Sequence, residues 1–201
     1  QDMARQFAES GTAVVTTLTI FNSILDWLDD ERFAALQSRE NNKYLPTKIK
    51  KTYLDEKLNP YRDPNWPFTF KDISRSRALM GQLTEEFHHR GVNLILGVDA
   101  FGSVVPGFSI HKELSLLVDA GLTPYQALQT GTSNVAIYLG ELQDRGTLEQ
   151  GKLADFFLVA NNPLHNIANA KLVEGVFVNG KWLPKENLNA MLEQAAAINQ
   201  K

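Results

Sequence analysis

The hydrophobic and polar positions of the chain follow two patterns, one typical of helices and one typical of buried strands. Residues 12–21 and 92–98 are nearly unbroken runs of apolar or β-branched side chains, which predict strands buried on both faces of a parallel sheet. Apolar residues at helical spacing surround these runs and predict helices at 2–10, 22–38, 73–90 and 110–120. This alternation predicts an α/β fold with parallel strands.

Caps and turns are clearest in the second half of the chain. Thr123 predicts a helix N-cap, with Pro124 at the first helical position and Gln126 completing a capping box. Asn179-Gly180, flanked by apolar residues, is a strong hairpin signal. Further elements are expected in this order: a short helix at 133–139, short strands at 146–148, 151–159 and 173–182, and a final helix at 185–199.

The segment 39–71 differs in composition from its surroundings. It holds eight Lys or Arg residues against four Asp or Glu, six aromatic residues and four prolines, with a short helix expected around 47–58. We expect an excursion that packs onto the fold. Two alternatives are a lid over a substrate, because long loops in compact domains often have that role, and a surface for single-stranded nucleic acid.

Composition and charge exclude several classes of protein. The 201 residues carry a net charge of −3, which argues against a general nucleic-acid coat, and no apolar run approaches the roughly 20 residues of a membrane helix. The absence of cysteine rules out disulfides and thiolate metal sites. The compartment is left open, with the cytoplasm preferred and any signal peptide expected upstream. The chain begins without Met and already in a helical pattern, which favours a fragment of a longer protein.

Few residues carry a recognisable chemistry. His88 and His89 are adjacent on a predicted helix, so they point about 100° apart and cannot face one ion, and His165 lies in a loop. A complete zinc site is therefore not expected from this chain alone. Asp99 follows a buried strand, where α/β folds place ligand contacts, although a turn or cap role is the alternative. His111, at a helix start, is a candidate for contact with substrate, or else only a residue bonding nearby backbone.

Several motifs in fixed order resemble one known family. The runs are Leu96-Gly97-Val98-Asp99-Ala100, Ser109-Ile110-His111-Lys112-Glu113-Leu114, Ala120-Gly121-Leu122-Thr123-Pro124-Tyr125-Gln126-Ala127-Leu128, Thr132-Ser133-Asn134, Leu139-Gly140, Gly146-Thr147-Leu148, Gly151-Lys152-Leu153-Ala154-Asp155 and Asn162-Pro163-Leu164. Together they resemble the C-terminal part of the metal-dependent amidohydrolase superfamily, in its imidazolonepropionase-like and prolidase-like branch.

The resemblance implies an architecture. The expected fold is α/β: the C-terminal remnant of a (β/α)8 (TIM) barrel, part of a small β-sandwich domain and a C-terminal helix. Residues 1–140 would hold the last two barrel strands with their helices and the insertion 39–71. Residues 141–184 would form part of the small composite β-domain, and residues 185–201 the C-terminal helix.

The resemblance also implies a reaction, the hydrolysis of amide, cyclic amide or dipeptide C–N bonds in a small-molecule substrate. Asp99 would be the catalytic residue and a metal ligand, taking a proton from metal-bound water and passing it to the leaving group. His111 would contact substrate, and Asp155 would be structural. The complete enzyme would bind a divalent metal, with zinc the expected ion, whereas none is expected in the isolated chain.

The departures from the family pattern are large. The His-x-His after the first barrel strand, and the metal-site residues of the fourth, fifth and sixth strands, are absent from this sequence. The isolated chain is therefore expected to be inactive. Two strands cannot close a barrel, so exposed edges predict self-association, with no nucleic-acid or membrane partner. The alternative is a non-enzymatic interaction domain on an amidohydrolase-derived scaffold, with 39–71 as its contact surface.

Overall fold

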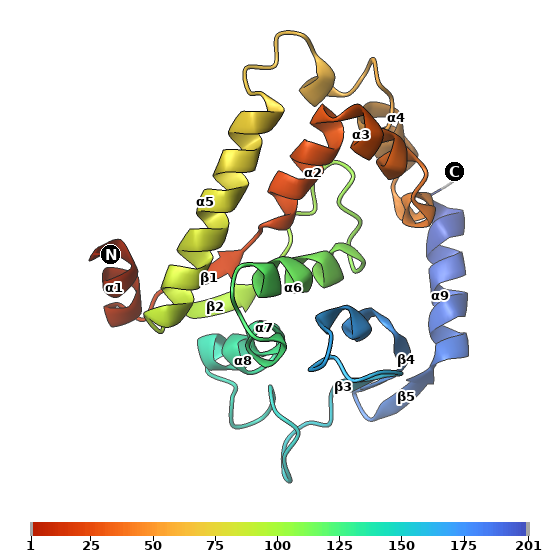
Figure 1. Ribbon diagram of the computed structural model, residues 1–201. Helices are drawn as coiled ribbons and strands as arrows, with labels where there is room; N and C mark the ends of the chain where they lie inside the picture. Colours follow the sequence, from red (N-terminus) through yellow and green to blue (C-terminus); the bar gives the residue numbers. More distant parts are fainter. Residues whose placement is uncertain (1, 200–201) are drawn as a thin grey trace.

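The computed structural model describes residues 2–199 as a mixed α/β fold (Figure 1). Gln1, Gln200 and Lys201, at the ends of the predicted first and last segments, lie outside the described residues. In chain order the elements, with η for 3-10 helices, are α1 (Asp2–Glu9), β1 (Ala13–Thr16), α2 (Thr19–Leu28), α3 (Asp30–Gln37), η1 (Glu40–Tyr44), α4 (Thr47–Tyr53), η2 (Pro60–Arg62), α5 (Phe70–His89), β2 (Asn93–Leu96), α6 (Ser109–Asp119), α7 (Pro124–Thr130), α8 (Ser133–Leu139), β3 (Phe156–Val159), η3 (Ile167–Lys171), β4 (Val173–Val178), β5 (Lys181–Pro184) and α9 (Lys185–Ile198).

The strands β1 and β2 form a two-stranded parallel sheet, as the alternation of patterns predicts. Their register pairs Ala13 with Asn93 and Thr16 with Leu96. Helices α5, α6, α7 and α8 all contact β2. Within residues 2–199 no further strand joins this sheet, so no barrel closes.

The first strand is shorter than predicted. The prediction of a strand over 12–21 is wrong beyond Thr16, because the chain turns and α2 begins at Thr19. Val15 is also 56% exposed, which contradicts the expectation of a strand buried on both faces. The reason is that helices α5 to α8 pack against β2, whereas no helix of the described residues packs extensively against β1.

The single helix predicted over 22–38 is two helices. They are separated at Asp29, whose backbone is extended and whose side chain caps α3 by accepting from the Arg32 amide. The break brings Phe33 and Leu36 into a small buried cluster with Trp27.

The segment 39–71 packs onto this cluster, as expected. Tyr53 and Tyr61 contact Trp27 with ring centroids 5.3 and 4.5 Å away. The predicted helix at 47–58 is confirmed in part, as α4 ends at Tyr53. Most of the aromatic side chains of the segment thus pack within the protein, although Phe68 and Phe70 remain exposed.

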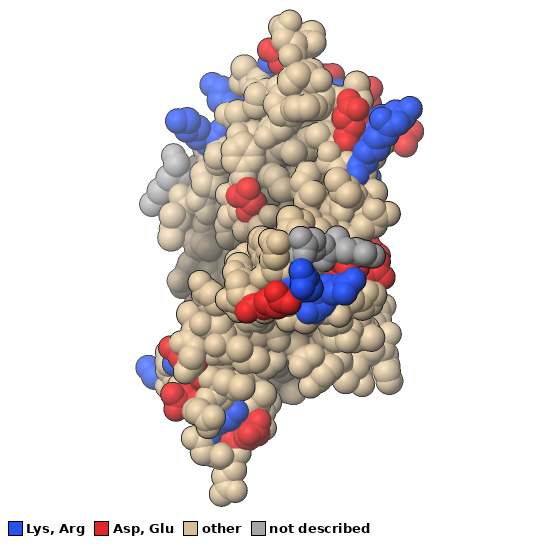
Figure 2. Space-filling view, turned by 90° about the vertical axis from the view of Figure 1, so that its left-hand side faces the viewer, with Lys and Arg blue, Asp and Glu red and all other residues tan. Residues whose placement is uncertain are grey.

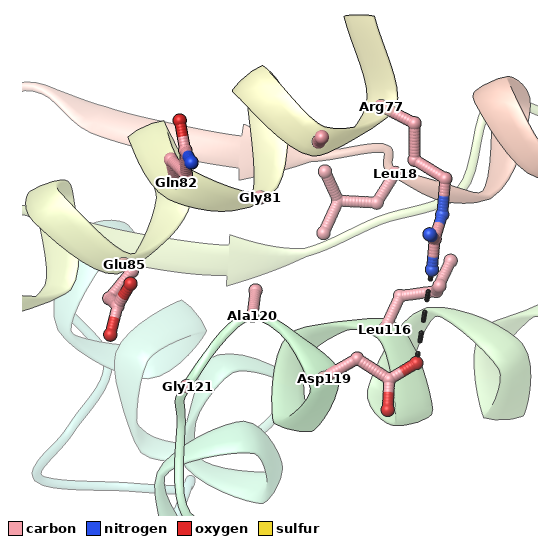
Figure 3. A pocket seen from close by; sticks show the side chains of 10 residues that line it. Leu18, Arg77, Gly81, Gln82, Glu85, Leu116, Asp119, Ala120 and Gly121 are labelled. Carbon is pink, nitrogen blue, oxygen red and sulfur yellow. Dashed lines mark ion pairs between the residues drawn. The ribbon is translucent and has the colours of Figure 1, made fainter. Parts of the chain in front are cut away.

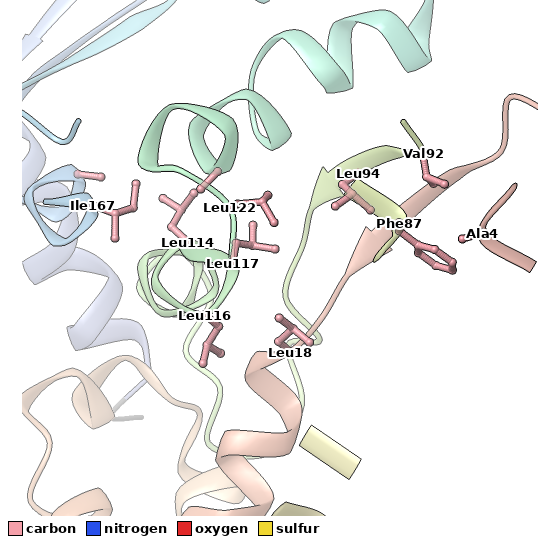
Figure 4. Close-up of a cluster of buried hydrophobic side chains, with 12 residues drawn as sticks. Ala4, Leu18, Phe87, Val92, Leu94, Leu114, Leu116, Leu117, Leu122 and Ile167 are labelled. Carbon is pink, nitrogen blue, oxygen red and sulfur yellow. The ribbon is translucent and has the colours of Figure 1, made fainter. Parts of the chain in front are cut away.

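The main core lies where α1, both parallel strands and helices α5, α6 and α7 meet (Figure 4). Its buried members are Ala4, Leu18, Phe87, Val92, Leu94, Leu114, Leu116, Leu117, Leu122, Ala127, Ile167 and Ala170. Ile167 and Ala170 come from η3, so the core continues toward the second sheet.

The second sheet is antiparallel and has the order β3-β4-β5. The hairpin predicted at Asn179-Gly180 is confirmed, and both residues adopt positive φ angles of 51° and 72°. Asp155 accepts a hydrogen bond from the Asn179 amide at 3.1 Å, which fits its predicted structural role. The strand predicted at 146–148 is wrong, because Gly146 has a φ of 95° and this stretch has no strand partner among the described residues.

The C-terminal helix α9 contacts β4, β5 and η1. Just beyond it, Asn199 Nδ2 donates to the Tyr44 carbonyl at 2.9 Å, and Thr47 Oγ1 donates to the Asn199 carbonyl at 3.1 Å. These bonds join the end of the described chain to the segment 39–71.

Charged side chains of both signs are interspersed on the face shown in Figure 2, and neither sign forms a continuous patch there. Within residues 2–199, none of the helices combines the length and the apolar character that a bilayer crossing requires.

Candidate functional site

Asp99 lies three residues beyond the end of β2, on the edge where β1 also ends. Its side chain is exposed, and its backbone carbonyl accepts from the Phe101 amide at 2.8 Å. The chain leaves the sheet here as a loop that runs to α6 at Ser109. A carboxylate at the carboxyl end of parallel strands can reach a bound ligand, as the sequence predicts.

An aromatic cluster from three parts of the chain lies close to Asp99. Phe101 packs edge-on against Trp27, Tyr53 and Tyr61, with centroid distances of 6.3, 5.3 and 6.3 Å. Burial raises the pKa of the Tyr61 phenol, and the neighbouring Tyr53 and the Asp99 charge raise it further. The segment 39–71 therefore brings a phenol within electrostatic range of the predicted catalytic carboxylate.

The loop after Asp99 is held tightly against this cluster. Gly102 has a φ of 59°, and a Cβ there would lie 2.6 Å from the Trp27 ring. Glycine is required on both counts, because other residues rarely adopt this φ and the ring leaves no room. The sequence signalled the aromatic residues of 39–71 but not their partner Trp27, which lies on α2.

A cavity of about 280 Å³ lies beside the aromatic cluster. Trp27, Tyr61, Trp66 and Phe68 contribute aromatic faces, and Arg62 and Asp63 contribute charges of opposite sign. Arg62 is fixed, since its guanidinium donates to the Trp27 carbonyl at 2.8 Å. Asp99 does not line this cavity.

His111 lies in the first turn of α6 and is half-buried. Burial lowers the pKa of its imidazole, and the positive charge of Lys171 on η3 lowers it further. Its Nδ1 atom is buried and has no hydrogen-bond partner among the described residues. No hydrogen bond or ion pair of the described residues joins His111 to Asp99, so its contact with substrate stays a prediction.

The described residues do not by themselves fit a metal. Nowhere in residues 2–199 do three His, Cys, Asp or Glu side chains gather so that they could hold an ion. His88 and His89 are successive residues of α5 with ring centroids 6.0 Å apart, as expected from their spacing. Of the predicted ligands, the structure therefore offers Asp99 alone.

Glu113 is a buried structural carboxylate near the site that the sequence reasoning missed. It is completely buried, and its carboxylate accepts from the Leu18 amide at 2.9 Å, the Thr19 amide at 2.7 Å and the Thr19 hydroxyl at 2.6 Å. Glu113 thus caps the N-terminus of α2, and its hydrogen bonds connect α6 to the chain just beyond β1. A signal existed, since Glu113 falls three residues after Ile110 and four before Leu117, on the apolar face of the predicted helix.

A further cavity of about 250 Å³ separates α5 from α6 (Figure 3). Arg77 reaches across it toward Asp119, with 3.9 Å between the charged atoms. Leu18 and Leu116 provide its apolar wall. None of the predicted site residues lines it.

The fold is similar to solved hydrolase structures. The chain matches a bottromycin amidohydrolase with a TM-score of 0.72 and 21% identity, over 93% of this chain and 40% of that one. It matches a prolidase in complex with N-methylphosphonate-L-proline with a TM-score of 0.60 and 17% identity, over 90% of this chain and 37% of that one. A putative prolidase from Bifidobacterium longum gives a TM-score of 0.52 at 24% identity, over 84% of this chain and 44% of that one.

The chain therefore spans less than half the length of these structures. No curated protein matches it. The model of the Amidohydrolase family matches residues 19–183, which is most of the chain and includes both Asp99 and His111. This chain belongs to the amidohydrolase family.

Proposed function

We propose that the chain is the C-terminal portion of a metal-dependent hydrolase that acts on amide, cyclic amide or dipeptide C–N bonds. The observation that carries the proposal is the Asp99 carboxylate, exposed at the carboxyl end of a parallel strand within the region that matches the family. The partial coverage of the similar structures supports the view that further barrel strands belong to the same enzyme.

In this proposal Asp99 moves the proton. An exposed carboxylate can accept a proton from an attacking water and return it to the leaving nitrogen, which balances the hydrolysis. The nearby Tyr61 phenol, whose pKa is raised, stays protonated near neutral pH and can donate a hydrogen bond. His111 is the proposed contact with a small amide substrate.

The metal ligands are the part that this chain does not supply. Because no cluster of three ligands exists in residues 2–199, the remaining ligands of a divalent ion, expected to be zinc, would come from outside these 201 residues. The 201-residue chain alone should then contain no stoichiometric metal and hydrolyse nothing. A Xaa-Pro dipeptidase is among the similar structures, so Xaa-Pro dipeptides are the first substrates to test.

The test compares the 201-residue chain with a protein extended to the full length of an amidohydrolase barrel by its own upstream coding sequence. Elemental analysis should find metal, and a panel of dipeptides and cyclic amides should be hydrolysed, only in the extended protein. Asp99→Asn should then lower kcat by about 100-fold or more, because general acid–base catalysis contributes that much. The exposed Asp144→Asn is the matched control. Metal-dependent hydrolysis by the 201-residue chain alone would refute the proposal.

The alternative of a non-enzymatic interaction domain has less support. It needs the aromatic residues of 39–71 as a contact surface, and Tyr53 and Tyr61 instead pack against the buried Trp27. The same packing argues against a stacking platform for single-stranded nucleic acid, which requires accessible rings.

A further inference from the structure

A third cavity, of about 590 Å³, is not lined by Asp99 and has a different chemistry. It is enclosed by α2, α3, η1, α5 and the start of α6, together with the loop that precedes α6. Its lining is mostly polar or charged: Thr19, Asn22, Ser23, Leu25, Asp26, Arg32, Arg39, Asn41, Arg77, Ser103, Val104, Phe108, Ser109 and Lys112.

The charge of this lining is predominantly positive. Four cationic side chains contribute to it, against the single carboxylate of Asp26. The Asp26 carboxylate is already paired, since it accepts hydrogen bonds from Arg32 at 2.6 Å and from Arg39 at 2.7 Å. The buried carboxylate of Glu113 does not line the cavity, and it already accepts three hydrogen bonds from Leu18 and Thr19.

Two residues of this lining carry a buried donor without an acceptor. The Nε atoms of Arg32 and Arg77 are buried and have no hydrogen-bond partner among the described residues. Arg77 has Asp119 as its ion-pair partner, at the long distance of 3.9 Å (Figure 3). Lys112 forms no ion pair with any residue from 2 to 199. Buried donors without acceptors are costly, so an anion in the cavity would relieve this cost.

We propose that this cavity binds a small organic anion that carries two or more carboxylate or phosphate groups. Guanidinium groups recognise both kinds of oxyanion through paired hydrogen bonds, and the Lys112 ammonium adds a point charge. The volume falls in the range of sites for small organic ligands. Asp99 does not line the cavity, although Ser103 and Val104 come from the loop that follows it.

The test titrates the 201-residue chain with citrate and with pyrophosphate by calorimetry, at constant ionic strength maintained with chloride. Binding with a dissociation constant of about 1 mM or tighter is expected for at least one probe. Stronger binding of citrate would identify a carboxylate ligand, and stronger binding of pyrophosphate a phosphate ligand.

Two variants locate the site. Lys112→Gln and Arg77→Gln should each weaken binding by about 10-fold or more, because each removes a charge-assisted contact. Arg75→Gln, on α5 but outside the lining, is the matched control and should change binding by less than about twofold. Lys112 is exposed, so its substitution should leave folding intact. The proposal fails if neither probe binds, or if Lys112→Gln and Arg75→Gln bind equally well.

Discussion

At the scale of single residues, the buried carboxylate of Glu113 decides how two helices meet. It accepts three hydrogen bonds from Leu18 and Thr19, more than 90 positions earlier in the chain. A buried charge is tolerated only where donors surround it, as they do here. Glu113 therefore stabilises one arrangement of α2 and α6.

We expect Glu113→Gln to lower the free energy of unfolding by about 3 kcal/mol, because a neutral amide replaces a carboxylate and places its own donors against backbone amides. Urea denaturation measures this change. Glu186→Gln, at an exposed position of α9, is the matched control and should change stability by less than about 0.5 kcal/mol. Similar losses in the two variants would contradict the assigned role of Glu113.

The half-buried imidazole of His111 predicts a pH dependence of stability. Its folded pKa lies below the ordinary 6.5, through burial first and Lys171 second, so the unfolded chain binds the proton more readily. The contribution of His111 to the free energy of unfolding is fully present above the pKa of the unfolded chain. It is lost as the pH falls from about 6.5 toward the lower pKa of the folded state.

Unfolding free energies between pH 5 and 8 check this expectation. The free energy of unfolding should decrease less on acidification in His111→Gln than in the unsubstituted chain. In His89→Gln, which changes an exposed histidine, the full decrease should persist. An unchanged slope in His111→Gln would show that other groups cause the dependence.

At the scale of elements, the sequence predicted best where local chemistry sets the boundary. The capping box of Thr123 and Gln126 starts α7 as expected, and Asn179-Gly180 turns the last hairpin. Each signal lies within a few residues of the boundary that it determines, so no distant contact is needed to find it.

The end of β1 could not be predicted in the same way. The β-branched residues between Thr16 and Ile20 favour a strand, yet α2 begins at Thr19. The donors freed at its start bind Glu113, which a local pattern cannot reveal. The same holds for the candidate site. The local pattern was enough to predict that Asp99 follows a strand. The position of Tyr61 close to Asp99 could not be predicted, because it depends on how a distant segment packs.

The loop between β2 and α6 offers a matched pair of glycines. Gly102 and Gly107 both have positive φ angles, of 59° and 81°, but only a Cβ at Gly102 would collide with Trp27. Gly102→Ala should destabilise by about 3 kcal/mol or more, and Gly107→Ala by about 1 kcal/mol from backbone strain alone. Urea denaturation followed by tryptophan fluorescence gives both values. Equal losses of stability in the two variants would mean that the Trp27 ring can move aside without an energetic cost.

At the scale of the whole molecule, apolar side chains remain exposed along both sheets. Val15 is 56% exposed, and Phe157 and Leu158 on β3 are 46% and 54% exposed. β3 is an edge strand in the described part of the chain, and edge strands of this composition attract further strands. We propose that the 201-residue chain self-associates through these edges.

Sedimentation equilibrium should therefore show an average mass that rises above 22.5 kDa with concentration. Phe157→Lys should weaken this association by about 10-fold, because a charge on an edge strand opposes pairing. Leu58→Lys, exposed in the segment 39–71, should leave it unchanged. A monomer at every concentration would contradict the proposal.

The contact between Asn199 and Tyr44 has a consequence for folding kinetics. It joins positions 155 residues apart, so its formation encloses most of the chain in one loop. Closing such a loop is entropically costly until the intervening segments are already compact. We therefore expect this contact to form in the last steps of folding, with α9 docking on η1 after both sheets and the helices between them are in place.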